Sequence, residues 1–131
     1  MLAAEPLLLE LARTLAKRTV TQPADLAAVV DALAAAYAPD GALAVAFRTE
    51  WLGVANNKTA RLALAWAREQ VRLALLEILE RARAEGLVKT AGDTETLAWL
   101  CLAGCEALAH EPPSAIPDRV QALARFLAES R

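Results

Sequence analysis

The sequence contains few of the residues on which catalytic, metal and redox sites depend. Its 131 residues include one histidine, two cysteines and five glycines. There is no zinc-type pair of histidines and no Glu-x-x-His pair, and the dispersed glycines form no phosphate-binding loop. No motif supports catalysis. We therefore expect a protein that is not an enzyme and that uses neither a cofactor nor a metal ion.

Long apolar runs and an excess of basic charge are also missing. No uninterrupted apolar run reaches the ~18 residues of a membrane span, and residues 1–15 lack the basic segment of a signal peptide. The 14 basic residues are balanced by 16 acidic ones, for a formal net charge of −2. A nucleic-acid-binding surface usually has a basic excess. We therefore expect a cytoplasmic protein that contacts neither a membrane nor, by itself, DNA.

Aromatic and β-branched residues are scarce, whereas alanine and leucine are abundant. Aromatic residues make up 5% of the chain, and alanine and leucine together supply 55 of the 131 residues. Alanine and leucine lose little conformational freedom in a helix, whereas β-branched residues lose more. The hydrophobic fraction of 56% is too high for a disordered chain. The composition predicts an all-α protein, and the length allows one domain over residues 1–131.

Hydrophobic periodicity and breaker residues divide the chain into a single bundle of five to six helices. The predicted ranges are about 2–18, 23–38, 42–54, 58–85, 93–109 and 116–129. The breaks between them include the Pro39-Asp40-Gly41 turn, Gly86 and the Pro112-Pro113 loop. On the longest helix, we expect large apolar side chains to share the buried face: Leu62, Trp66, Leu73, Leu76 and Leu79.

Residues 97–105 contain no charged side chain. A surface helix needs one polar face, and a domain of this size has a limited interior. The segment therefore either lies at the centre of the domain or buries one face against a second copy of the chain. We favour the second interpretation, a homodimer, in which Ala103, Gly104 and Ala107 let another backbone approach closely.

Cys101 and Cys105 lie four residues apart, and His110 follows five residues later. The arrangement weakly resembles the Cys-x-x-Cys and histidine signature of alkylhydroperoxidase-D-like helical enzymes, but both intervals are one residue longer. Thiols at this helical spacing do not easily meet disulfide geometry. We favour core packing for the cysteines and a helix C-terminal role for His110. A thiol-dependent enzyme is the weaker alternative.

The large aromatic residues are candidates for a ligand site. Phe47 and Trp51 share a face of the third predicted helix, Trp66 lies on the fourth and Trp99 on the fifth. If these helices pack together, the rings line one interior cavity, because ligand pockets are typically apolar with a few polar groups. The polar groups available nearby are those of Arg48, Glu50, Asn56 and Gln70. The commoner role of sparse aromatic residues in a helical bundle rich in alanine and leucine is to fill the core, and we favour this role for the rings; lining a pocket does not exclude it.

The C-terminal half contains a long charged helix ending in ALLEILERARAEGLV, then the segment GDTETLAWLCLAGCEALAH, then an amphipathic helix. Over about residues 58–130, this order resembles the C-terminal effector-binding and dimerisation domain of TetR-family transcriptional regulators. The resemblance implies that the helices at about 93–109 and 116–129 pair with those of a second subunit in a four-helix bundle. The interface residues expected on this basis are Leu100, Ala103, Gly104, Ala107, Leu123, Phe126 and Leu127.

The same resemblance implies a small apolar or amphipathic effector in a cavity among the preceding helices. The candidate ligand-binding residues are Phe47, Trp51, Trp66, Gln70 and Trp99. The helix-turn-helix head of the family is not visible in residues 1–50, where Thr19 occupies the place of a helix-ending glycine. DNA would then be bound only through a head domain absent from this chain. The alternative functions are a ligand-free helical interaction module and the thiol enzyme.

Overall fold

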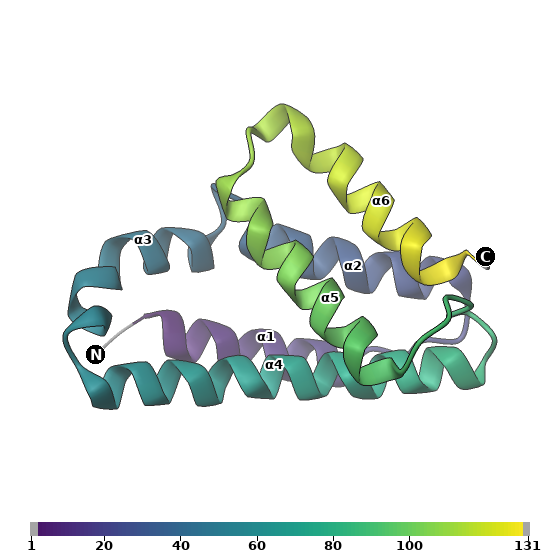
Figure 1. Ribbon diagram of the computed structural model, residues 1–131, viewed down its shortest axis with the longest axis horizontal. Coiled ribbons are helices and arrows are strands. Elements are labelled where there is room, and N and C mark those ends of the chain that lie inside the picture. The colour runs from purple at the N-terminus through teal and green to yellow at the C-terminus, as the bar shows by residue number, and fades with distance from the viewer. Residues whose placement is uncertain (1–2, 130–131) are drawn as a thin grey trace.

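The computed structural model describes residues 3–129, which form one all-α helical bundle (Figure 1). The α-helices of this range are α1 (Ala4–Ala16), α2 (Pro23–Tyr37), α3 (Ala42–Ala55), α4 (Lys58–Ala84), α5 (Thr94–Ala107) and α6 (Ile116–Ala128). Two 3₁₀ turns, η1 (Leu108–His110) and η2 (Pro113–Ala115), connect α5 to α6, and the described range contains no strand. The predicted fold class is confirmed. Helix boundaries match the predicted ones within two residues, except that the predicted start at Leu2 lies outside the described residues.

Side-chain caps explain where two of these helices begin. The side-chain oxygen of Asn57 accepts a hydrogen bond from the Ala60 N–H at 3.1 Å at the start of α4. The Asp93 carboxylate accepts one from the Thr96 N–H at 2.7 Å at the start of α5. Such caps satisfy N–H groups that have no partner within the helix. At the other end of α4, Gly86 adopts a positive φ of 76°, the conformation that ends many helices.

The helices pack in an order that brings the ends of α2, α3 and α5 together. α1 and α4 lie side by side and run in the same direction, and α5 crosses from the end of α4 over α2 (Figure 1). α6 returns antiparallel to α5 and also contacts α2. α3 contacts α1, α2 and α4. The largest fully buried side chains between these helices include Leu8, Leu33, Leu75, Ile78 and Leu102.

The buried face of α4 differs from the predicted one. Leu62, Trp66 and Leu73 are exposed, at 60%, 57% and 43%, whereas Leu76 is half-buried and Leu79 is fully buried. The side chains that α4 buries are Ala67, Val71, Ala74, Leu75, Ile78, Leu79 and Ala82. The alanines allow the backbones of α4 and its neighbour α1 to approach closely. Close packing along the alanine-containing stripe therefore prevails over burial of the largest side chains.

The stretch Pro23–Ala55 is long and apolar enough to cross a membrane when judged by length and composition alone. In the structure this stretch forms two helices, α2 and α3, separated by a turn. Leu26, Val29, Val30 and Leu33 of α2 are buried in the core. Part of the high hydropathy of this stretch therefore comes from α2 residues that are packed in the core.

The cap of α5 predicts a specific pH dependence of stability. Hydrogen bonds from the Thr96 backbone N–H and hydroxyl lower the pKa of the Asp93 carboxyl below its ordinary value of 3.8. Because the folded-state pKa is lowered, this stabilisation is complete above the ordinary pKa and is lost as the pH falls through the folded-state value. In urea unfolding at a series of pH values, we expect the stability difference between wild type and Asp93→Ala to be constant near neutral pH and to shrink in acid.

Asp93→Asn is the matched control for this titration, because the amide oxygen still accepts the capping hydrogen bond but does not ionise. The stability difference between Asp93→Asn and Asp93→Ala should therefore stay constant over the same pH series. A wild-type advantage over Asp93→Ala that persists unchanged into strong acid would contradict the assignment of the cap.

Candidate functional site

The five predicted ligand-binding residues do not share one interior cavity. Trp51, Trp66 and Trp99 are exposed at 61%, 57% and 54%, and Phe47 is exposed at 36%. Phe47 lines a pocket between α2, α3 and η1, whereas Trp66 and Gln70 line a separate groove between α1 and α4. The exposed tryptophans do not fill the core either. The physical reason for Trp51 and Trp66 is that α3 and α4 turn alanine-containing faces inward, which leaves these two rings outside. Trp99 lies on α5, which turns Leu97, Ala98, Cys101, Leu102 and Cys105 inward instead.

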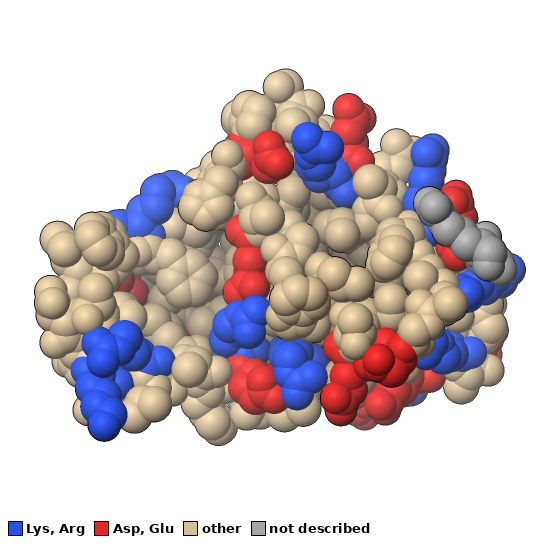
Figure 2. Space-filling view, in the orientation of Figure 1, with Lys and Arg blue, Asp and Glu red and all other residues tan. Residues whose placement is uncertain are grey.

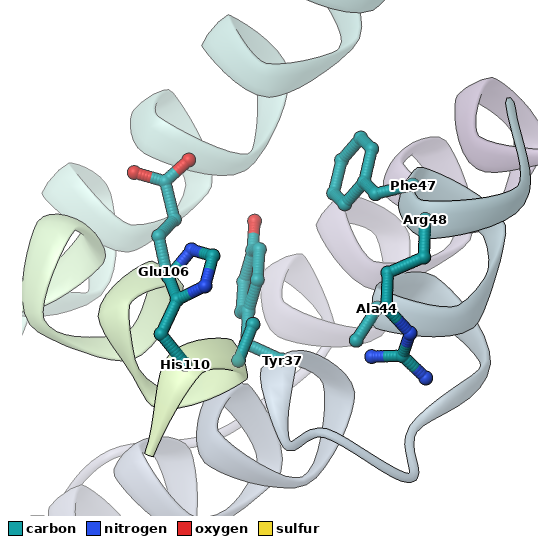
Figure 3. A pocket seen from close by; sticks show the side chains of 7 residues that line it. Tyr37, Ala44, Phe47, Arg48, Glu106 and His110 are labelled. Carbon is teal, nitrogen blue, oxygen red and sulfur yellow. The ribbon is translucent and has the colours of Figure 1, made fainter. Parts of the chain in front are cut away.

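The pocket at Phe47 has a volume of about 220 Å³ (Figure 3). It lies where the last residue of α2 meets the first half of α3 and the end of α5 with the η1 turn. Its lining residues are Tyr37, Ala44, Phe47, Arg48, Glu106, Ala109 and His110. We call it the Tyr37 pocket. Its volume is below the range of about 300–1,000 Å³ that holds drug-sized ligands, so it suits a smaller molecule.

Tyr37 is the unusual residue of this pocket. Its side chain is only 2% exposed, and among residues 3–129 its hydroxyl has no hydrogen-bond partner. Burial, together with the nearby negative charge of Glu106, raises the pKa of the Tyr37 hydroxyl, which therefore stays protonated. Leaving a buried hydroxyl unpaired costs about 1–3 kcal/mol. An orphaned donor of this kind calls for an explanation beyond packing.

An ion pair stands beside the Tyr37 pocket. The Arg68 guanidinium on α4 donates two hydrogen bonds to the Glu106 carboxylate on α5, Nε to Oε2 at 2.7 Å and Nη2 to Oε1 at 2.8 Å. This paired geometry raises the pKa of Arg68 and commits its guanidinium to Glu106. Arg48 also lines the pocket, but its guanidinium points away from Tyr37 (Figure 3) and donates to the Pro39 carbonyl at 2.8 Å. Neither arginine is therefore held ready for an anionic ligand.

Glu50 and Asn56, which the sequence offered as polar groups near the aromatic residues, have structural roles. The Glu50 carboxylate accepts hydrogen bonds from the backbone N–H groups of Ala3, at 2.7 Å, and Ala4, at 3.1 Å. Glu50, a residue of α3, therefore caps the start of α1. The Asn56 side-chain amide donates to the Leu52 carbonyl at 3.1 Å at the end of α3.

The two cysteines and the histidine do not form a common site. Cys101 and Cys105 are free thiols, exposed at only 2% and 0%, in the core face of α5. A hydrogen bond with Cys101 and burial both raise the pKa of the Cys105 thiol. A protonated, buried thiol is a poor nucleophile. His110 is exposed and belongs to the lining of the Tyr37 pocket.

α5 has one face in the core and a second face that its own chain leaves open. Leu97, Ala98, Cys101, Leu102 and Cys105 are buried. The open face carries residues with exposed or half-buried side chains: Trp99 at 54%, Leu100 at 39%, Ala103 and Ala107. Uncharged atoms predominate over the middle of this surface, whereas many charged side chains gather along its lower edge (Figure 2). We call these four residues the open face of α5.

Two of the predicted interface residues serve the fold of their own chain. Leu127 is only 1% exposed and belongs to the core, so it is not available to a partner. A Cβ atom at Gly104 would lie 2.9 Å from Cδ2 of Leu123, so the close approach that Gly104 permits is to α6 of the same chain. Leu123 is half-buried in this contact. Phe126, in contrast, is 41% exposed on α6.

Comparison of the chain with protein-family models, with curated proteins and with solved structures gives no match.

The sequence patterns did not identify Tyr37 as a binding residue. The available signal was a lone tyrosine in a stripe of aliphatic residues, because a buried tyrosine usually needs a hydrogen-bond partner. Glu106 and Ala109 were also missed. Nothing in their local sequence indicates that α5 and η1 end beside α2 and α3.

Proposed function

We propose that this chain is the dimerisation and ligand-sensing domain of a TetR-like transcriptional regulator in the cytoplasm. The observation that carries the proposal is the open face of α5, Trp99, Leu100, Ala103 and Ala107, which is uncharged and not covered by the chain itself. Contiguous apolar surface exposed on a monomer marks an interaction site or promotes aggregation. A second copy of the chain covers this face without requiring another protein.

The arrangement of α5 and α6 suits a symmetric dimer. In a two-fold dimer the same surface of each copy faces its equivalent, so one self-complementary patch is sufficient. On the antiparallel neighbour α6, Phe126 is also exposed, at 41%. Two antiparallel α5–α6 pairs then form a four-helix bundle between the subunits. Leu127 and Gly104 stay within their own subunits and support this face from behind.

The Tyr37 pocket supplies the sensing element of the proposal. Glu106 on α5, together with Ala109 and His110 on η1, forms one wall of this pocket. A ligand that binds more tightly to one placement of α5 shifts the dimer towards that placement. Any effect on DNA would pass through a DNA-binding head outside residues 1–131, since the basic and acidic residues of this range are nearly balanced, at 14 and 16.

The dimer is tested by placing charges on the open face. We expect wild type to be a dimer in sedimentation and light scattering, and Leu100→Glu combined with Phe126→Glu to be a folded monomer. Burying carboxylates opposite each other should weaken association at least about a hundredfold, or about 2.7 kcal/mol. Leu62→Glu is the matched control, because Leu62 is also exposed, at 60%, but lies on α4.

Circular dichroism of all three proteins separates loss of the dimer from loss of the fold. A wild-type protein that stays monomeric at high concentration would overturn the proposal. A double variant that dimerises as tightly as Leu62→Glu would overturn it as well.

A ligand-free interaction module is the second candidate, and one observation favours it. Trp51 and Leu52, both 61% exposed on α3, and Leu62 on α4 leave apolar surface at the opposite end of the molecule from the loop before α5. Such surface can dock another protein. If the Tyr37 pocket binds no small molecule while the dimer forms, this second function is the better account.

A further inference from the structure

We propose that the Tyr37 pocket binds a small uncharged molecule with an apolar body and one oxygen that accepts a hydrogen bond from the Tyr37 hydroxyl. The proposal rests on the sensing function proposed above and specifies the chemical class of its ligand. Simple phenols and small cyclic alcohols or ketones belong to this class.

The orphaned hydroxyl of Tyr37 defines the polar end of the ligand. It is buried behind the lining, and among residues 3–129 it has no hydrogen-bond partner, so one donor is left unused. The hydroxyl points to the same side as the Glu106 carboxylate, and the Phe47 ring lies across the gap from both (Figure 3). A ligand oxygen placed in this gap supplies the missing acceptor, and a purely apolar ligand of the same size leaves the hydroxyl unpaired.

The remainder of the lining defines an apolar body. Ala44, Phe47 and Ala109 contribute hydrocarbon surface, and Tyr37 contributes its ring. Aromatic rings prefer offset or edge-to-face contacts with other rings, so a six-membered ring suits the space between Phe47 and Tyr37. The volume of about 220 Å³ admits a molecule of this size and excludes larger effectors.

The charges around the pocket exclude ionic ligands. An anion would meet the Glu106 carboxylate, and Arg68 is already committed to that carboxylate through two hydrogen bonds. Arg48 is directed to the Pro39 carbonyl. A cation would have to compete with Arg68 for Glu106. Burying a charge without a partner is much more costly than burying a hydroxyl, so the pocket favours the neutral molecule.

Phe47 provides the entrance. The Tyr37 hydroxyl is closed to solvent, whereas Phe47 is 36% exposed at the rim. Rotation of an exposed side chain takes place in picoseconds to nanoseconds. A ligand can therefore reach the hydroxyl by displacing the Phe47 ring without any opening of the bundle.

The test uses three probes of similar size on the full chain: phenol, toluene, which lacks the oxygen, and benzoate, which is an anion. Binding is followed by NMR through the backbone amides of Ala44, Ala109 and His110. We expect saturable binding of phenol in the millimolar range and no saturable binding of benzoate. Tyr37→Phe should weaken phenol binding about five- to tenfold and leave toluene binding unchanged.

Two further variants locate the binding. Ala109→Leu fills the pocket from η1 and should abolish phenol binding. Ala16→Leu adds the same atoms at an exposed position in the groove between α1 and α4, where Trp66 lies, and should have no effect. Tyr37→Phe also removes an unpaired buried hydroxyl, so its melting temperature in the absence of ligand should be equal to or above that of wild type.

The proposal is overturned if phenol does not saturate any of these amides, or if Tyr37→Phe binds phenol as tightly as wild type does. Either result with an intact dimer would leave the dimerisation function standing and reject only the ligand class. A monomeric wild type would reject the dimerisation function, whatever the outcome with phenol. The two failures are therefore distinguishable.

Discussion

Replacing Leu75 with alanine should lower the free energy of unfolding by about 2–5 kcal/mol. Leu75 lies on α4 and is fully buried, at 0% exposure, in the core that α4 shares with its neighbouring helices. The substitution removes three methyl or methine carbons from a closely packed interior and leaves a cavity that the rigid helices fill only in part. Urea unfolding at a fixed protein concentration measures the loss, because the stability of a dimer depends on concentration.

Leu62→Ala is the matched control for this experiment. It changes the same residue type on the same helix, but Leu62 is 60% exposed and its removal opens no cavity. We expect a change within about 0.5 kcal/mol. A larger loss for Leu62→Ala than for Leu75→Ala would mean that α4 packs through the face containing Leu62, as the sequence pattern predicted, and would contradict the structure.

Gly41→Ala should destabilise the fold by about 1–3 kcal/mol. Gly41 is in the turn between α2 and α3, where an added Cβ would lie 2.7 Å from the backbone oxygen of Ala35 and 2.8 Å from that of Ala36. Backbone oxygens cannot move aside as a flexible side chain can, so the turn must open. The turn also holds Tyr37 against α3. The variant should therefore weaken phenol binding as well as shift the urea midpoint.

Gly53→Ala provides a control with the opposite sign. Gly53 lies inside α3, and an added Cβ would have no other atom within 4 Å. Alanine in place of glycine inside a helix stabilises it by about 0.5–1 kcal/mol. Thermal or urea unfolding should therefore rank Gly53→Ala above wild type and Gly41→Ala below it. Destabilisation by both variants would contradict the contacts assigned to Gly41.

The helix boundaries were predictable because short-range chemistry determines them. The Pro39-Asp40-Gly41 turn interrupts two apolar helices, and Asn57, Asp93 and Gly86 stand at helix ends where their side chains or positive φ are needed. These signals act within a few residues and do not depend on how the helices pack. The order and length of the helices could therefore be predicted from the sequence alone.

The buried faces of α3 and α4 were not predictable in the same way. The pattern favoured Phe47, Trp51 and Trp66 as interior residues because of their size. The structure instead buries Ala46 and Ala67 on these helices. In a chain so rich in alanine, several stripes of each helix are apolar enough to be buried. The stripe that is buried is the one that allows the closest packing of the two helix backbones. This property depends on both helices together and cannot be read from the sequence of either one.

The Tyr37 pocket could not be predicted from the sequence for a related reason. Tyr37 and Glu106 are 69 positions apart in the chain, and they meet only because α5 crosses α2. The uncharged segment 97–105, in contrast, did indicate an unusual surface. Five of its side chains enter the core, and Trp99 and Leu100 stay exposed. The interface remains a prediction, and Leu127 is removed from it.

The hydrogen bonds between Glu50 and the start of α1 link α3 directly to α1. The Glu50 carboxylate accepts hydrogen bonds from the backbone amides of Ala3 and Ala4. Phe47, one turn earlier on α3, lies at the rim of the Tyr37 pocket. α3 therefore connects the rim of the pocket to the first turn of α1 through two side chains one helical turn apart.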